Sequence, residues 1–207
     1  MIRSASTFPA ATGTATILAD YTIAPLTVEQ YHAMARAGIL EEGAPIELLE
    51  GYLVEKMTKH PPHSVATQLT QDALRRVLPS GWRARAQEPI TLVDSEPEPD
   101  VAIVRGDARH YLARHPGPTE VALVVEVADS SLTVDRGAKR RIYARAGIPV
   151  YWIVNLVDRC VECYADPVGP ARNPLYTSTE VYAPGEQLPL VIDGVEVSLI
   201  AVDDILP

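Results

Sequence analysis

Two carboxylates and one lysine carry the chemistry that this sequence could perform. Asp100 follows an acidic, proline-rich turn, Glu126 interrupts an apolar run, and Lys139 lies in the basic segment that comes next. Carboxylates on neighbouring strands form a hard oxygen site suited to Mg²⁺ or Mn²⁺. A nearby lysine can stabilise charge that develops on a phosphate, or can orient and deprotonate water. Together these groups predict metal-assisted hydrolysis of a phosphodiester bond.

Residues 121–155 must position two of these groups. They form an apolar run, an amphipathic basic segment and a second apolar run, which predicts a strand, a helix and a strand. Apolar residues flank Glu126 on both sides, so its strand is expected inside a covered sheet. A buried carboxylate without a partner costs several kcal/mol. Glu126 is therefore expected either to meet a cation or to stand at the strand end and face water.

Lys139 is expected on the helix face that packs on the sheet. It shares that face, at helical spacing, with three later residues: Ile142, Tyr143 and Ala146. Asp135 is the expected N-cap, and Gly147 followed by Pro149 is expected to end the helix. From there the ammonium of Lys139 can extend over the strand ends toward Glu126. The alternative is a lysine whose stem covers apolar surface while its ammonium stays in water.

The segments before this unit give weaker signals. Residues 1–25 are rich in Ser, Thr, Ala and Pro and predict a flexible N-terminal arm, which leaves residues 26–207 for one folded domain. Thr27 and Gln30 form a capping-box pattern before a short helix. Residues 46–55 predict a hairpin that turns at Glu50 and Gly51.

Two further elements lead up to Asp100. A helix is expected from Ser64, with a buried stripe consisting of Val65, Leu69, Ala73 and Val77. Residues 83–92 look strand-like, although Pro89 indicates an edge or a bend. Asp100 then opens a buried strand over residues 101–104, and further strands are expected at residues 160–165, 177–182, 188–192 and 195–200.

The composition limits the classes of function. The 207 residues carry a net charge of −9, which argues against a whole-surface grip on nucleic acid and requires a local basic patch or bound metal instead. Cys160 and Cys163 have CxxC spacing, but no second pair and no nearby histidine accompany them, so we interpret them as ordinary thiols. No signal peptide is evident and no apolar run is long enough to span a bilayer, which makes the cytoplasm the expected location.

The motifs of this chain resemble a known family. Pro99 and Asp100 precede an apolar strand, the sequence VVEV contains Glu126, and the run DRGxKxxxYARAGIPxYWIV extends over residues 135–154. With IELLEG at 46–51, PHSV around His63 and the closing LPLVIDGVEVSL, this pattern resembles the bacterial "putative restriction endonuclease" family of the PD-(D/E)xK nuclease superfamily. The similarity covers roughly residues 27–206.

The resemblance implies a fold, a site and a substrate. It implies an α/β fold with a restriction-endonuclease-like core, in which a mixed central sheet is flanked by helices and extended by antiparallel strands. It implies Asp100, Glu126 and the Val127 carbonyl as ligands of Mg²⁺ or Mn²⁺, and DNA as the substrate of what we expect to be a homodimer. Glu47 and His63 are implied accessory residues, against the alternatives of a solvated hairpin acid and a structural or helix-capping histidine.

One departure from the superfamily pattern leaves two hypotheses open. The usual lysine position, two residues after the acid, is Ala128 in this sequence. The first hypothesis is that Lys139 takes that role and the protein is an active nuclease. The second is a catalytically inactive module that binds a protein or nucleic acid. Two arginine groups are interpreted as solvated faces or as phosphate contacts: Arg136, Arg140, Arg141 and Arg145 in the basic segment, and Arg75, Arg76, Arg83 and Arg85 earlier in the chain.

Overall fold

A mixed β-sheet forms the centre of the protein. The computed structural model describes residues 23–41, 43–169 and 173–207, so most of the expected arm, residues 1–22, lies outside the described residues. Six strands follow one another across the sheet: β3 (Trp82–Ala86), β4 (Val101–Arg105), β5 (Val121–Ala128), β6 (Val150–Asn155), β7 (Cys160–Val168) and β8 (Leu175–Tyr182). Strands β5 and β6 run parallel and the other neighbours are antiparallel, which confirms the expected mixed sheet.

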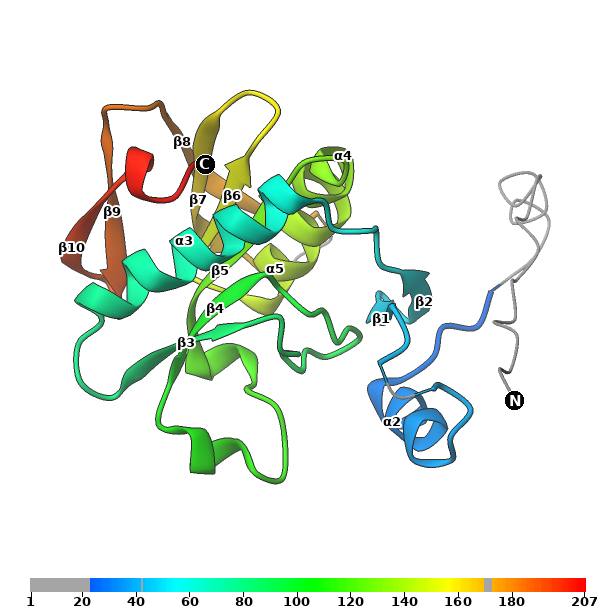
Figure 1. Cartoon of the computed structure of the whole chain (residues 1–207). Coiled ribbons are helices and arrows are strands. Elements are labelled where there is room, and N and C mark those ends of the chain that lie inside the picture. Colours follow the sequence, from blue (N-terminus) through cyan, green and yellow to red (C-terminus); the bar gives the residue numbers. More distant parts are fainter. Residues whose placement is uncertain (1–22, 42, 170–172) are drawn as a thin grey trace, which may run out of the picture.

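Two hydrophobic cores cover the two faces of this sheet. On one face, helix α3 (Pro61–Val77) and the hairpin of β9 (Gln187–Ile192) and β10 (Val195–Ala201) pack against alternate residues of β5 and β6. On the other face lies α5 (Arg140–Ala146), together with the buried Ile90 and Leu92. Figure 1 shows α3 crossing the sheet in front of β4 and β5. Strand β5 is buried along its whole length, as its apolar sequence predicts.

The strand–helix–strand prediction for residues 121–155 is confirmed, with one correction. The helix begins at Leu132 as α4 (Leu132–Val134), passes through a π turn at Asp135–Lys139 and continues as α5. Asp135 is therefore inside the helical run and 1% exposed, so the prediction that it is the N-cap is wrong. Gly147 ends the helix with φ 72°, in the left-handed region that glycine tolerates.

The N-terminal elements stand to one side of the sheet (Figure 1). Helix α2 (Val28–Arg36) has the predicted capping box between Thr27 and Gln30. Strands β1 (Ile46–Leu49) and β2 (Tyr52–Glu55) form the predicted hairpin, and the two turn residues, Glu50 and Gly51, have φ values of 50° and 81°. Positive φ at both positions matches the turn type that favours tight hairpins.

Two boundaries differ from the sequence-based expectation. Helix α3 starts at Pro61 rather than Ser64, because proline fits the first helical positions, where its missing N–H costs little. Its buried residues include Ala66, Ala73 and Leu74, whereas Val65 is 45% exposed. Strand β3 ends at Ala86, before the bend that Pro89 indicated. None of the helices in the described part of the chain has the length and apolar character of a membrane span.

Candidate active site

Glu126 and Lys139 form an ion pair at the end of β5. Glu126 is 3% exposed, and the Nζ of Lys139 lies 3.0 Å from its Oε1. The Lys139 side chain is 12% exposed, so its ammonium is directed into the protein and does not extend into bulk water. The prediction that the two groups meet is confirmed, and the water-facing alternatives for both residues are wrong.

Tyr143 is a third member of this cluster, which sequence reasoning did not assign to the site. Its hydroxyl donates a 2.6 Å hydrogen bond to Glu126 Oε1, and its ring is fully buried. The sequence contains a pattern that could have identified Tyr143, because it lies one helical turn beyond Lys139 on the same face. The phenol and the ammonium therefore hold one carboxylate oxygen between them.

Asp100 lies at the adjacent strand start and is 5% exposed. Its Oδ2 accepts a 2.9 Å hydrogen bond from the N–H of Val127 and lies 3.1 Å from Nε2 of His63, while its Oδ1 lies 3.5 Å from Nζ of Lys59. Burial alone would raise the pKa of Asp100, but the contacts with His63 and Val127 outweigh burial and lower it. Asp100 is thus held as a carboxylate.

The β1–β2 hairpin brings Glu47 over the same cluster. Glu47 is 4% exposed, its Oε2 accepts a hydrogen bond from the backbone N–H of Glu98, and its Oε1 lies 3.8 Å from Nζ of Lys139. The alternative of a solvated hairpin acid is therefore wrong. Arg141 and Arg145 fix this hairpin, since both form ion pairs with Glu50 in its turn.

Asp135, which the sequence analysis interpreted as an N-cap, is a further buried acid of this site. The hydroxyl of Ser131 donates a 2.6 Å hydrogen bond to its Oδ2. Burial raises the pKa of Asp135, although the charge of Lys139 opposes that rise. The π turn brings both residues to the site, and turns of this kind recur at functional positions.

The charged groups described above, Glu47, Asp100, Glu126, Asp135 and Lys139, line one pocket of about 110 Å³. Its lining contains seven acids, namely Glu47, Glu55, Glu98, Asp100, Glu126, Asp129 and Asp135, against three lysines, namely Lys56, Lys59 and Lys139. His60 and His63 complete the ionisable groups. The pocket is therefore acidic and suits a bound cation better than a free anion.

The acidic surroundings control the proton balance of the central pair. Burial would lower the pKa of Lys139, but the charges of Glu126, Glu47 and Asp135 raise it well above its ordinary value. Burial and the neighbouring acids raise the pKa of Glu126, and the ammonium of Lys139, 3.0 Å away, opposes that rise and favours the carboxylate. The lysine thus keeps its proton, and the site favours any additional positive charge.

The two carboxylates of the pocket, Asp100 and Glu126, are the kind of ligand that Mg²⁺ and Mn²⁺ prefer. In the described residues no three side chains of His, Cys, Asp or Glu are gathered as a ready-made cation cage. Magnesium is commonly held by one or two carboxylates, with water and substrate phosphate completing its shell. Asp100 and Glu126 supply that number, and the N–H of Val127 already joins the two strands by bonding to Asp100.

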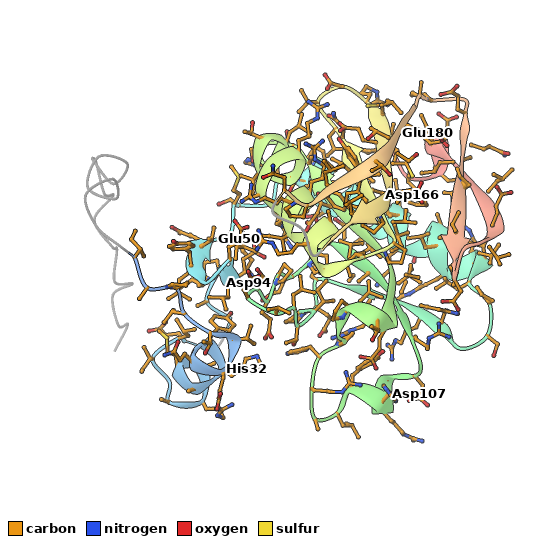
Figure 2. All side chains as sticks on the ribbon, turned by 180° about the vertical axis from the view of Figure 1, so that it is seen from behind. His32, Glu50, Asp94, Asp107, Asp166 and Glu180 are labelled. Atoms are coloured by element: carbon orange, nitrogen blue, oxygen red, sulfur yellow. The ribbon has the colours of Figure 1, made fainter. Side chains whose placement is uncertain are left out.

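The arginines of the basic segment are largely occupied by acids. Arg136 pairs with Glu162 at 2.6 Å, and Arg145 pairs with both Glu50 and Asp94, which lie beside each other in Figure 2. These arginines therefore tie the helical segment to the rest of the fold and are not a freely solvated face. The guanidinium of Arg140 lies 5.2 Å from the ring centre of Tyr164.

The earlier arginines divide into two kinds. Arg76 and Arg85 pair with Asp204 and Glu88. Arg75 and Arg83 line a second pocket, open and about 740 Å³ in volume, between the end of α3 and the edge strand β3. Among the described residues, Arg83 Nε is buried without a hydrogen-bond partner. Arg75 is exposed, whereas Arg83 is partly buried.

Comparisons with known proteins agree with this architecture. The family model described as "Putative restriction endonuclease" (Uma2) matches residues 28–202. The crystal structure of a "putative nuclease belonging to DUF820" from Anabaena variabilis ATCC 29413 resembles the fold with a TM-score of 0.64 and 17% sequence identity, over 87% of this chain and 97% of that chain. No curated protein matches this chain. The expected restriction-endonuclease-like fold is thereby confirmed.

Proposed function

We propose that this chain, which belongs to the Uma2 "Putative restriction endonuclease" family, is a metal-dependent nuclease that hydrolyses phosphodiester bonds in DNA. The observation that carries the proposal is the meeting of three groups from separate elements in one acidic pocket. Asp100, Glu126 and Lys139 all line it, and Lys139 lies 3.0 Å from Glu126. Perturbed, buried ionisable groups in a pocket are typical of catalytic sites.

The proposed metal ligands are Asp100, Glu126 and the Val127 carbonyl. A bound Mg²⁺ or Mn²⁺ would supply charge stabilisation at the phosphate and would lower the pKa of water. His63 positions Asp100 through its 3.1 Å contact, and Glu47 shares the ammonium of Lys139. Lys139 orients water or steadies negative charge on the phosphate.

We propose DNA as the substrate of this nuclease. The acidic pocket repels a phosphate backbone unless a cation is present, so catalytic contact with DNA is expected to require the metal. Arg75 and Arg83 are the proposed backbone contacts outside the pocket, because both line the open second pocket beside the edge strand β3. A homodimer stays a prediction.

The second candidate is a catalytically inactive module that binds a protein or nucleic acid. It is favoured by Ala128, which stands where the superfamily pattern has its lysine. Calorimetry with Mn²⁺ separates the two. The nuclease proposal predicts a heat of binding that disappears in Asp100→Asn and Glu126→Gln, whereas an inactive module needs no metal at these carboxylates.

A further inference from the structure

Lys59 contacts Asp100 from the segment that joins β2 to α3. Its Nζ lies 3.5 Å from Oδ1 of Asp100, its side chain is 37% exposed, and it lines the acidic pocket. Asp100 is the one acid recorded within ion-pair distance of Lys59 in the described part of the chain. A cation thus stands at the pocket mouth, in contact with a carboxylate that the proposed nuclease uses for metal.

The two lysines of the site have different surroundings. Lys139 is 12% exposed and is held between Glu126 and Glu47. Lys59 is three times as exposed, and it faces a single carboxylate oxygen on one side and solvent on the other. Lys139 is therefore committed to the buried acids, whereas Lys59 can exchange its partner without leaving a buried charge unpaired.

Asp100 cannot serve Lys59 and a divalent ion equally well. Its Oδ2 is engaged by the Val127 N–H and by His63, which leaves Oδ1, the oxygen facing Lys59, as the accessible ligand. A divalent ion on Oδ1 would neutralise the carboxylate and repel the ammonium beside it. Lys59 would then lose Asp100, the one acid within ion-pair distance of it among the described residues.

The N-terminus of α3 has fewer free backbone N–H donors for a phosphate than most helices. Helix N-termini commonly bind phosphate through free backbone N–H groups. Here Pro61 and Pro62 occupy the first two helical positions, so two of those donors are missing. Lys59 lies two residues before Pro61, so this segment offers a side-chain cation in place of those backbone donors.

We propose that Lys59 binds the substrate phosphate, moving from Asp100 to a non-bridging oxygen of the phosphodiester when the divalent ion occupies the site. This inference rests on the proposed nuclease function. It assigns a substrate contact to Lys59, which is not among the site residues predicted from the sequence. The ligand chemistry is that of a nucleic-acid phosphodiester.

The test compares Lys59→Gln, Lys59→Arg and the matched control Lys56→Gln. Lys56 lies on the same segment and lines the same pocket, but it pairs with Glu98. Mn²⁺ affinity is measured by calorimetry, and cleavage of a duplex oligonucleotide in Mn²⁺ gives kcat and KM. Lys59→Gln should bind Mn²⁺ at least as tightly as the wild type and lose about tenfold or more in kcat/KM. Lys59→Arg should retain most activity, and Lys56→Gln should stay within about twofold of the wild type.

Separate results overturn this inference and the function beneath it. Wild-type rates in Lys59→Gln, or a loss of Mn²⁺ affinity in proportion to the loss of cleavage, contradict the phosphate contact while leaving the nuclease proposal intact. A wild-type protein that binds no Mn²⁺ and cuts no DNA contradicts both. Melting temperatures of the three variants close to that of the wild type establish that folding is unaffected.

Discussion

The ammonium of Lys139 lies 3.0 Å from Oε1 of Glu126, although one residue comes from a helical segment and the other from the strand before it. The superfamily's usual lysine position is Ala128, which is fully buried in the core beneath α5. A longer side chain there would have to displace packed residues, and such overpacking is destabilising. The helix therefore delivers the charge that the strand has no room to carry.

Replacing Lys139 by methionine keeps the stem and removes the charge. We expect cleavage to fall by about a hundredfold or more, and the free energy of unfolding to fall by about 3 kcal/mol, because Glu126 loses its buried partner. Single-turnover cleavage and urea denaturation measure the two effects. Lys139→Arg is the control, and it should recover more stability than activity, since a guanidinium cannot reproduce the ammonium geometry. Wild-type cleavage by the methionine variant would remove Lys139 from the mechanism.

Tyr143→Phe tests the second bond to Glu126. The change removes a buried hydroxyl donor, which should lower the free energy of unfolding by about 1–3 kcal/mol and reduce cleavage, because Glu126 is then less well positioned. Tyr176→Phe is the matched control: its buried hydroxyl donates to the Ile148 carbonyl instead. Both variants should lose stability, but Tyr143→Phe alone should lose activity. Equal activity losses would mean that the phenol acts only through the fold.

The pair of Arg136 and Glu162 predicts a pH dependence of stability. Burial alone would raise the pKa of Glu162. Hydrogen bonds from Arg136, Tyr164 and Asn155 outweigh burial and lower this pKa below its ordinary value of 4.5. The folded state therefore binds a proton at Glu162 less tightly than the unfolded state does. The stabilisation from this carboxylate is complete above about pH 4.5 and is lost as the pH falls through the folded-state pKa. Glu162→Gln should melt at a lower temperature at neutral pH and show a smaller drop in acid. Parallel melting curves for the two proteins across the acid range would contradict the assignment.

Arg75 and Arg83 provide the test of DNA contact. In a Glu126→Gln background, which prevents cleavage, Arg75→Gln and Arg83→Gln should each weaken duplex binding and reduce the salt slope of the affinity by about 1. Arg76→Gln is the control on the same helix, because Arg76 already has Asp204 within 3.7 Å. Fluorescence anisotropy over a range of salt concentrations measures both quantities. Unchanged slopes in all three variants would exclude this edge of the sheet from the DNA interface.

The sequence predicted the central unit well because its signals were local and strong. An apolar run with one acid, a helix face containing Lys139 and a glycine stop all describe short-range structure, and each was found. The meeting of Lys139 with Glu126 followed because a crossover helix packs back on its own strand. The Lys139 contact with Glu47 depends on how a distant hairpin docks, and no local pattern encodes that docking.

The remaining site residues depended on tertiary context. Asp135 was misassigned because the helix begins earlier and a π turn shifts its register, which periodicity does not reveal. Lys59 gave no pattern signal, since it lies between elements and reaches Asp100 only through the folded chain. Val65 was wrongly expected to be buried, because the buried face of α3 includes the small or polar residues Ala66 and Thr70, which a search for large apolar residues overlooks.

The most direct test is cleavage of duplex DNA by purified protein in Mg²⁺ or Mn²⁺, with Asp100→Asn and Glu126→Gln alongside. The account predicts products with the wild type that disappear on chelation, and loss of at least about a hundredfold in rate with either variant. Circular dichroism should show that the variants remain folded. Absence of cleavage by folded, metal-loaded wild type, or equal cleavage by the variants, would contradict the central claim that these carboxylates hold a catalytic metal.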